Sequence, residues 1–222
     1  MSSNLFTLGD GVSPDVFTEL KRMLTEKRLP VNNYRKNSGK GRSQCFGIVK
    51  TRCGYYAGSR MNSLRPEVLM ELYNVANRIL PPDFIYTSIQ VNDNYETLPH
   101  KDKGNFGISA IVAFGDYTGG ELVIEETPVN IQHQVCFFDG SLYTHSTKPF
   151  GGQRFSLVFF KPAEDFREIP TYSTTTFERE LVLTESMGGI IRYFNKKGHC
   201  VWASDNNIPA VRRSKTTLRS CI

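Results

Sequence analysis

The chain has 222 residues, of which 39% are hydrophobic, 12% aromatic and 22% charged. This composition supports a packed core and excludes a wholly disordered chain, and the length predicts one domain with an extension. No run approaches 18 consecutive apolar residues, and the first residues lack the basic and apolar parts of a secretory signal. Five cysteines without C-x-x-C spacing argue against a disulfide framework and a structural zinc site. We therefore expect an intracellular protein, cytoplasmic or nuclear, without a membrane span.

The net charge of +5 is unevenly distributed along the chain. Residues 187–222 hold seven basic residues and one acid, and a second basic cluster lies in the Gly/Ser-rich stretch 33–43. Basic patches of this kind neutralise phosphates, although solvated tails and loops have the same composition. We predict a main domain over residues 1–170 and a basic C-terminal extension over residues 171–222.

Two helices are predicted in the first third of the chain. Ser13-Pro14 is typical of a helix start, and apolar residues recur at helical spacing from Phe17 to Pro30. A second helix is expected after Pro66, where one apolar stripe is formed by Val68, Leu69, Leu72, Val75, Ala76 and Ile79. Between the two helices, Cys45–Lys50 has the composition of a short strand.

From Phe84 onward the hydrophobic period changes from 3.6 to 2, which is typical of β-strands. The candidate strands are Ile85–Val91, Gly107–Phe114, Glu121–Ile124, Gln134–Phe138 and Phe155–Lys161. Turn signals separate them, among them Gly115-Asp116 and Gly151-Gly152, and residues 181–183 are a further candidate strand. Short strands without intervening helices indicate an antiparallel barrel or jelly roll, with the preceding helices packed on one sheet. The predicted fold class is α+β.

One histidine of the four, His100, is followed two residues later by an acid, Asp102. In an extended segment these two side chains point to the same face and can reach one metal ion. His145 is the candidate for a third ligand because it lies between two predicted strands, where a barrel mouth can receive it. His133 is the alternative. Two imidazoles and one carboxylate form the facial ligand set of non-haem Fe(II), which leaves three coordination positions open.

The predicted strand that begins at Phe155 follows a basic residue, Arg154. Alternation sends Arg154 and Ser156 to one face and Phe155 and Leu157 to the other. A guanidinium inside a barrel is costly unless it meets a carboxylate. An organic dicarboxylate bound by Arg154 and the Ser156 hydroxyl satisfies this requirement, and a protein carboxylate is the alternative.

The order of these residues resembles that of the Fe(II)/2-oxoglutarate-dependent dioxygenases, whose double-stranded β-helix carries an HxD…H triad and a downstream arginine. The resemblance covers residues 84–161 and implies a jelly-roll core. It implies that His100, Asp102 and His145 hold Fe(II) and are catalytic. It also implies that Arg154 and Ser156, with Asn92, bind the cosubstrate 2-oxoglutarate, and that O2 is consumed in hydroxylating a C–H bond.

Within this superfamily, the segment from His100 to Asn105 is similar to the HxDxxN segment of the TET/JBP group, which oxidises the methyl group of 5-methylcytosine or thymine. The similarity implies that Asn105 faces the substrate. The stretch 115–122 resembles a GDYxGGEL hairpin of dioxygenase-like proteins. The cysteine-rich zinc-binding region of animal TET enzymes is absent, so their way of docking DNA is not carried over.

A nucleic acid, with DNA favoured, is therefore the predicted partner, and chemistry on a duplex base requires that the base be flipped out. The basic segments supply cations for phosphates, and the candidate stacking residues are Tyr55, Tyr56, Tyr95, Phe106 and Trp202. A peptide hydroxylase of the prolyl-hydroxylase type has the same triad, arginine and barrel and is the alternative. A non-catalytic jelly-roll binding module is the third interpretation.

Overall fold

The computed structural model describes residues 5–31, 41–50, 56–162, 185–187, 190–194 and 200–205. The chain forms two compact units, the first made of Met1–Gln44 and Ile89–Lys161 and the second of Cys45–Ser88 and Pro162–Ile222. The predicted boundary between residues 170 and 171 and the candidate strand at 181–183 lie outside the described residues.

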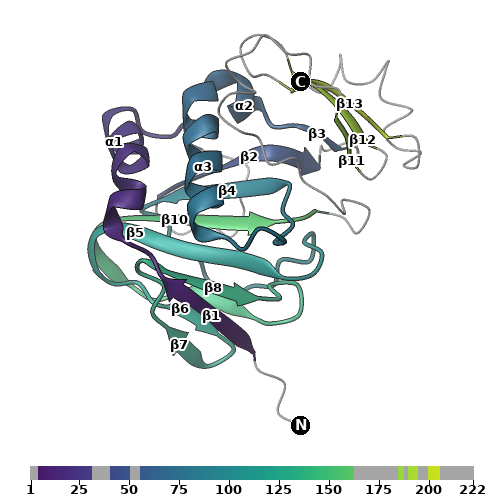
Figure 1. Ribbon diagram of the computed structural model, residues 1–222. Helices are drawn as coiled ribbons and strands as arrows, with labels where there is room; N and C mark the ends of the chain where they lie inside the picture. Colours follow the sequence, from purple (N-terminus) through teal and green to yellow (C-terminus); the bar gives the residue numbers. More distant parts are fainter. Residues whose placement is uncertain are drawn as a thin grey trace. The chain divides into compact units, whose positions relative to one another are not determined.

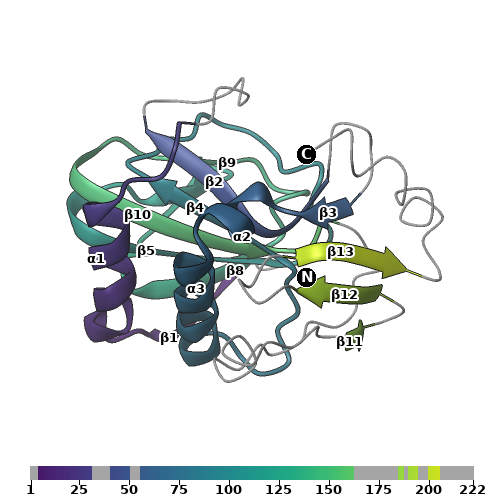
Figure 2. The same ribbon diagram turned by 90° about the horizontal axis from the view of Figure 1, so that it is seen from above.

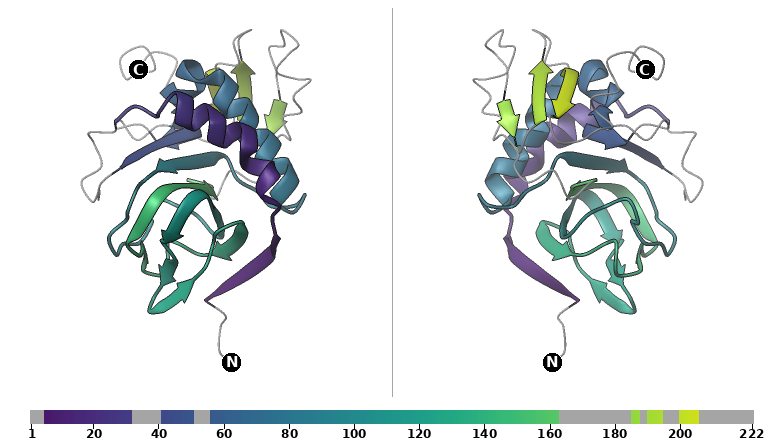
Figure 3. Two further views of the ribbon diagram at one scale, coloured as in Figure 1. Left: turned by 90° about the vertical axis from the view of Figure 1, so that its left-hand side faces the viewer. Right: turned by 90° about the vertical axis from the view of Figure 1, so that its right-hand side faces the viewer.

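The first unit contains two antiparallel sheets (Figure 1). The strands of the larger sheet lie in the order β1-β8-β5-β10-β4 and span Phe6–Gly11, Gln134–Phe138, Ser109–Gly119, Phe150–Phe160 and Ser88–Asp93. The smaller sheet has the order β7-β6-β9, with strands at Thr127–Val129, Leu122–Ile124 and His145–Thr147. In Figure 3 the teal and green strands curve around a shared interior. This arrangement confirms the predicted jelly roll.

The interior between these sheets is filled by apolar side chains from β5, β6, β7 and β8 and their connections. They are Ile111, Ala113, Tyr117, Leu122, Ile124, Val129, Ile131, Cys136 and Phe138. Because successive strand residues point to opposite faces, Phe114 of β5 points away from this interior. Its ring stacks on Phe17 with a centroid distance of 4.7 Å. The two faces of β5 therefore contribute to two different cores.

Phe17 ends a short 3-10 helix, Pro14–Phe17, and α1 (Thr18–Glu26) follows it directly. Leu20 and Leu24 of α1 are fully buried, and Lys21 forms an ion pair of 2.7 Å with Asp116 of β5. Figure 2 shows α1, in purple, beside β5 and β10. The predicted packing of an N-terminal helix on the larger sheet is thus confirmed for this helix.

Strands β5 and β10 are longer than the sequence predicts, because the expected turns at Gly115-Asp116 and Gly151-Gly152 are part of the strands. The two strands pair from Phe150 opposite Gly119 to Phe159 opposite Ala110. Gly115 and Gly152 have φ values of +116° and +99°, and a Cβ on either would lie 2.3 Å from a carbonyl oxygen of the opposite strand. These glycines permit close approach of two backbones rather than a turn.

The second unit contains the end of β2 (Arg42–Lys50), its antiparallel partner β3 (Tyr56–Gly58), α2 (Arg60–Leu64) and α3 (Pro66–Ile79). The predicted stripe of α3 is buried, from Val68 to Ala76. A three-stranded antiparallel sheet, β11-β12-β13, spans Glu185–Met187, Ile190–Phe194 and Cys200–Asp205. No helix in the described ranges is both long and apolar enough to cross a bilayer.

Candidate metal centre

Two loops of the first unit bring three of the predicted residues together. His100 and Asp102 lie in the connection between β4 and β5, and His145 begins β9. The amide of His100 donates to the carbonyl of His145 (3.0 Å), and the amide of His145 donates back to the carbonyl of His100 (2.9 Å). The Asp102 amide donates to the Gly140 carbonyl (2.8 Å). Main-chain hydrogen bonds therefore set the spacing of the three side chains.

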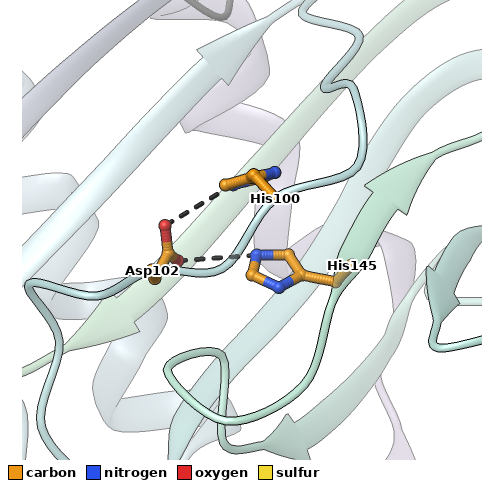
Figure 4. A group of neighbouring side chains, drawn as sticks. All are labelled: His100, Asp102 and His145. Atoms are coloured by element: carbon orange, nitrogen blue, oxygen red, sulfur yellow. Dashed lines mark ion pairs between the residues drawn. The ribbon is translucent and has the colours of Figure 1, made fainter.

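The side chains of His100 and His145 both point toward the Asp102 carboxylate (Figure 4). The Nε2 atom of His100 is 3.5 Å from one carboxylate oxygen, and Nε2 of His145 is 3.5 Å from the other. One candidate ligand atom from each residue lies within 4.8 Å of the others. A separation of 3.5 Å exceeds the usual range of a hydrogen bond. The arrangement suits three atoms that share an ion between them.

Backbone carbonyls fix the orientation of both imidazole rings. Nδ1 of His100 is 2.8 Å from the Leu98 carbonyl oxygen, and Nδ1 of His145 is 3.1 Å from that of Tyr143. Because a carbonyl only accepts, each Nδ1 carries a proton and donates it, so in the neutral ring the lone pair is on Nε2, the nitrogen that faces Asp102. Outer contacts of this kind orient histidine ligands in metal proteins.

The Asp102 carboxylate also has a neighbour on its own loop. The Asn105 side-chain amide donates to Asp102 Oδ2 over 3.2 Å. Burial alone would raise the pKa of Asp102, but the adjacent His100 and His145 side chains, when protonated, outweigh burial and hold that pKa well below its usual range. The carboxylate is therefore anionic throughout the neutral range, as a metal ligand must be.

The alternative ligand, His133, lies apart from this group. Its ring stacks on Phe17 with a centroid distance of 5.9 Å, and its backbone has a φ of +53°. Burial and the nearby charge of Lys21 lower the pKa of His133. His133 therefore packs where α1 contacts the larger sheet and is not part of the candidate metal group.

A small cavity of about 90 Å³ opens beside the three residues. Its polar wall includes Asn92, Asn105, Ser156 and also Gln90, and its apolar wall is lined by Ile111, Leu122, Phe138, Val158 and Phe160. Tyr95 is buried and lines the cavity, while Phe106 is exposed outside it. The other candidate stacking residues, Tyr55, Tyr56 and Trp202, have side chains outside the described part of the structure. Most of both basic segments lies outside it too.

A buried hydrogen-bond chain forms the polar wall of the cavity. Asn92 accepts from the Ser43 hydroxyl (2.5 Å) and donates to the Ser156 hydroxyl (3.1 Å), and Gln90 donates to Ser43 (2.8 Å). Gln90 and Ser43 were not predicted as site residues from the sequence. The signal for Gln90 was its alternation with Asn92 on a strand that is buried throughout.

Arg154 is 2% exposed and lies on β10 two residues before Ser156. Its Cζ atom is 5.5 Å from the ring centroids of both Tyr117 and Phe150. Gly120, with φ of +72°, makes room for it, because a Cβ at that position would lie 2.9 Å from the Cδ and Nε atoms of Arg154. Arg154 itself does not line the cavity, whereas Ser156 does.

The guanidinium of Arg154 is incompletely paired within the described residues. Its Nε atom has no hydrogen-bond partner there, and no carboxylate of the described residues forms an ion pair with it. Burial lowers the pKa of Arg154, and Tyr117 opposes this effect. A buried cation of this kind requires a carboxylate partner, which a bound dicarboxylate would supply. The donor set and this arginine thus fit both Fe(II) and 2-oxoglutarate.

No protein-family model matches the chain. It is 30% identical over 136 residues to the bifunctional helicase and thymine dioxygenase JBP2 of Trypanosoma brucei brucei. The match covers 56% of this chain but only 12% of the length of that relative.

Among solved structures, the chain is similar to NgTET1 in complex with 5mC DNA, with a TM-score of 0.50, 17% identity and coverage of 71% of this chain and 72% of the other. A Pseudomonas putida prolyl-4-hydroxylase has a TM-score of 0.44 and 14% identity, over 73% of this chain and 95% of the other. The chain thus shares the jelly-roll fold of NgTET1, and its described residues bring together a His-Asp-His group that could hold a metal ion.

Proposed function

We propose that this chain is an Fe(II)- and 2-oxoglutarate-dependent dioxygenase that hydroxylates the methyl group of 5-methylcytosine or thymine in a nucleic acid, with DNA favoured. The observation that carries the proposal is the convergence of His100, Asp102 and His145 beside a cavity that Asn105 also lines. The relative named a thymine dioxygenase and the fold shared with a protein solved on 5mC DNA support the choice of substrate. This function implies an intracellular compartment.

In this proposal the three residues hold Fe(II) through the two Nε2 atoms and the Asp102 carboxylate. When bound, the iron supplies the activation of O2 that is coupled to decarboxylation of 2-oxoglutarate. The reaction converts the substrate methyl group, O2 and 2-oxoglutarate into a hydroxymethyl group, succinate and CO2. One oxygen atom enters each oxidised product, so the two electrons lost by the methyl group and the two lost by 2-oxoglutarate reduce O2.

Arg154, Ser156 and Asn92 are assigned to the cosubstrate. The guanidinium pairs with the distal carboxylate, and the Ser156 hydroxyl, positioned by Asn92 over 3.1 Å, adds a hydrogen bond. This pairing supplies the counter-ion that Arg154 lacks among the described residues. It also explains why a strand with a buried apolar face carries a cation on its other face.

Asn105 is assigned to the substrate and has a second contact as well. Its amide nitrogen donates to Asp102, which leaves its carbonyl oxygen to accept from an N–H group of a pyrimidine base. A base has such N–H groups on its pairing edge, which becomes accessible when the base leaves the duplex. One side chain then links the position of the base to the metal-binding carboxylate.

The test is succinate release from 2-oxoglutarate with added Fe(II), in separate reactions with methylated DNA, methylated RNA, a peptide pool and no polymer. We expect the largest stimulation with methylated DNA, together with a hydroxymethylated nucleoside detected by mass spectrometry. Stimulation by peptides alone would assign the chain to peptide hydroxylation. A folded protein that releases no succinate under any condition would favour a non-catalytic binding module.

A further inference from the structure

Exposed apolar side chains gather on the loops that carry the metal group. Seven large hydrophobic residues are exposed within the described part of the chain, and four of them are Leu98 (58%), Phe106 (41%), Ile108 (52%) and Leu142 (60%). The first three lie on the loop that contains His100 and Asp102, and Leu142 lies on the loop that precedes His145. Exposed apolar groups that cluster next to a cavity mark binding surfaces more often than scattered ones. We call these four residues the rim.

The rim residues lie on segments that are bonded to one another. Lys101 Nζ donates to the Leu142 carbonyl (2.7 Å), which joins the two loops. The Phe106 amide donates to the Lys161 carbonyl (2.8 Å), which joins the first loop to the end of β10. Phe160, the neighbour of Lys161, lines the cavity together with the metal group. The rim therefore belongs to the two joined loops that carry the metal group, although none of its four residues lines the cavity itself.

Cations accompany the apolar side chains of the rim. Lys101 and Lys103 flank Asp102, which belongs to the metal group, and the Nζ atom of Lys161 is 5.2 Å from the Phe106 ring centroid. On the second loop, the Asp139 carboxylate accepts hydrogen bonds from the amide and hydroxyl of Ser141 (2.9 and 2.6 Å) and is engaged in its own turn. The rim thus offers apolar surface and positive charge together.

We propose that the rim binds a nucleic-acid strand whose bases are unpaired, with base faces against Phe106, Leu98 and Leu142 and with phosphates near the lysines. The combination of flat apolar surface and cations is what single-stranded nucleic acids require, because stacking and phosphate contacts act side by side. In a paired duplex the base faces are covered by their neighbours. The inference rests on the proposed function for its substrate class and assigns the surface that holds the strand outside the small cavity.

The test is fluorescence anisotropy with the full chain, a labelled single-stranded DNA containing one 5-methylcytosine, and a chelator, so that binding is measured without turnover. We expect Phe106→Ala to weaken binding by about 5- to 100-fold, the range for loss of one base-stacking contact. The double variant Lys101→Gln/Lys103→Gln should reduce the slope of log K against log salt by about 1.4, since each phosphate contact on a single strand contributes about 0.7.

Leu8→Ala is the matched control, because Leu8 is 51% exposed and lies on β1, not on the loops of the rim. It should bind as the unmodified chain does, and thermal melting should show that all variants fold. Binding by Phe106→Ala equal to that of Leu8→Ala would overturn the inference. Tighter binding of the intact duplex than of the single strand, or binding of an acidic peptide in preference to DNA, would overturn it as well.

The two proposals fail in different ways. If the chain binds the single strand through the rim but never releases succinate, the proposed dioxygenase function fails and the rim stands. If methylated DNA stimulates succinate release while the rim variants bind it normally, the rim inference fails and the function stands.

Discussion

Along β10, adjacent residues on the two faces of the strand are similarly buried but chemically different. On one face Phe155, Leu157 and Phe159 are fully buried, and the Phe155 ring lies 5.4 Å from that of Phe114, which in turn stacks on the helix side. On the other face Arg154 and Ser156 are both 2% exposed and belong to the polar part of the candidate site. The same strand therefore serves a core on one side and a site on the other.

Burial alone does not distinguish residues that stabilise the core from residues that bind a ligand. A buried polar group without a hydrogen-bond partner does indicate a ligand-binding residue. An apolar side chain is satisfied by contact, so Phe155 requires nothing beyond its neighbours. The Nε atom of the buried Arg154 guanidinium has no partner among the described residues. Such a group either binds a ligand or destabilises the fold. Substitutions on the apolar face should therefore lower stability, and substitutions on the polar face should change activity or the KM for 2-oxoglutarate.

The largest effect is expected from a metal-group residue beside the polar face. His145→Ala should lower Fe(II)-dependent succinate release by at least about 10³-fold, because the chemistry depends on a metal held by all three residues. The melting temperature should fall only slightly, because the two main-chain hydrogen bonds between His145 and His100 remain and the ring contact with Phe138, 5.0 Å between centroids, is lost. His133→Ala is the control and should keep its activity; if it loses activity and His145→Ala does not, the ligand assignment is wrong.

The apolar face should respond in stability instead of activity. Phe155→Ala should lower the free energy of unfolding by about 3–5 kcal/mol, the usual cost of truncating a buried phenylalanine. Ser156→Ala, at the next position and similarly buried, should cost only about 1 kcal/mol, while it raises the KM for 2-oxoglutarate. Urea denaturation and succinate kinetics on both variants test this pair. Equal losses of stability in Phe155→Ala and Ser156→Ala would show that the two faces of β10 do not differ in the way proposed.

Arg154→Met replaces the buried cation with an apolar side chain of similar length. We expect the KM for 2-oxoglutarate to rise by about 100-fold, while the free energy of unfolding stays the same or increases, because an incompletely paired charge is no longer buried. Kinetics and urea denaturation again give the two readouts. A large loss of stability with unchanged KM would show that Arg154 serves the fold and not the cosubstrate.

A smaller effect is expected at the edge of the metal group. Asn105→Ala removes the donor to Asp102 and should weaken metal binding by about 10-fold, the lower end for loss of an outer-shell contact. Titration with Co(II), followed by its visible absorption, measures this affinity without turnover. An unchanged affinity together with a raised KM for DNA would restrict Asn105 to the substrate.

The regular elements could be predicted where local pattern alone decides them. Gln134–Phe138 is predicted and observed with the same bounds, and α3 begins at Pro66 as expected. Strand β1, Phe6–Gly11, was missed because two glycines hide its alternation, and pairing with β8 is what makes it a strand. Gly115 was interpreted as a turn for a similar reason. Glycine is needed there because the backbone of Gln153, which is far away in sequence, approaches closely.

The candidate site was predictable to the extent that its residues are ordered along the chain. His100 and Asp102 share a face by spacing, and alternation separates Arg154 from Phe155. The bond between Ser43 and Asn92 joins residues 49 positions apart, and the space that Gly120 leaves for Arg154 depends on the pairing of β5 with β10. Such contacts form only when the chain folds, so local sequence patterns do not predict them.

The paired main-chain hydrogen bonds between His100 and His145 have a consequence for the life of the metal site. They hold the two ligand residues at a fixed spacing through atoms that no metal ion touches. In small zinc domains the metal supplies the folding free energy, and its removal unfolds the chain. Here we expect iron to be lost, or replaced by another divalent ion, with the fold intact. Oxidative loss of the iron would then leave a protein that can be reloaded, rather than one that must be degraded.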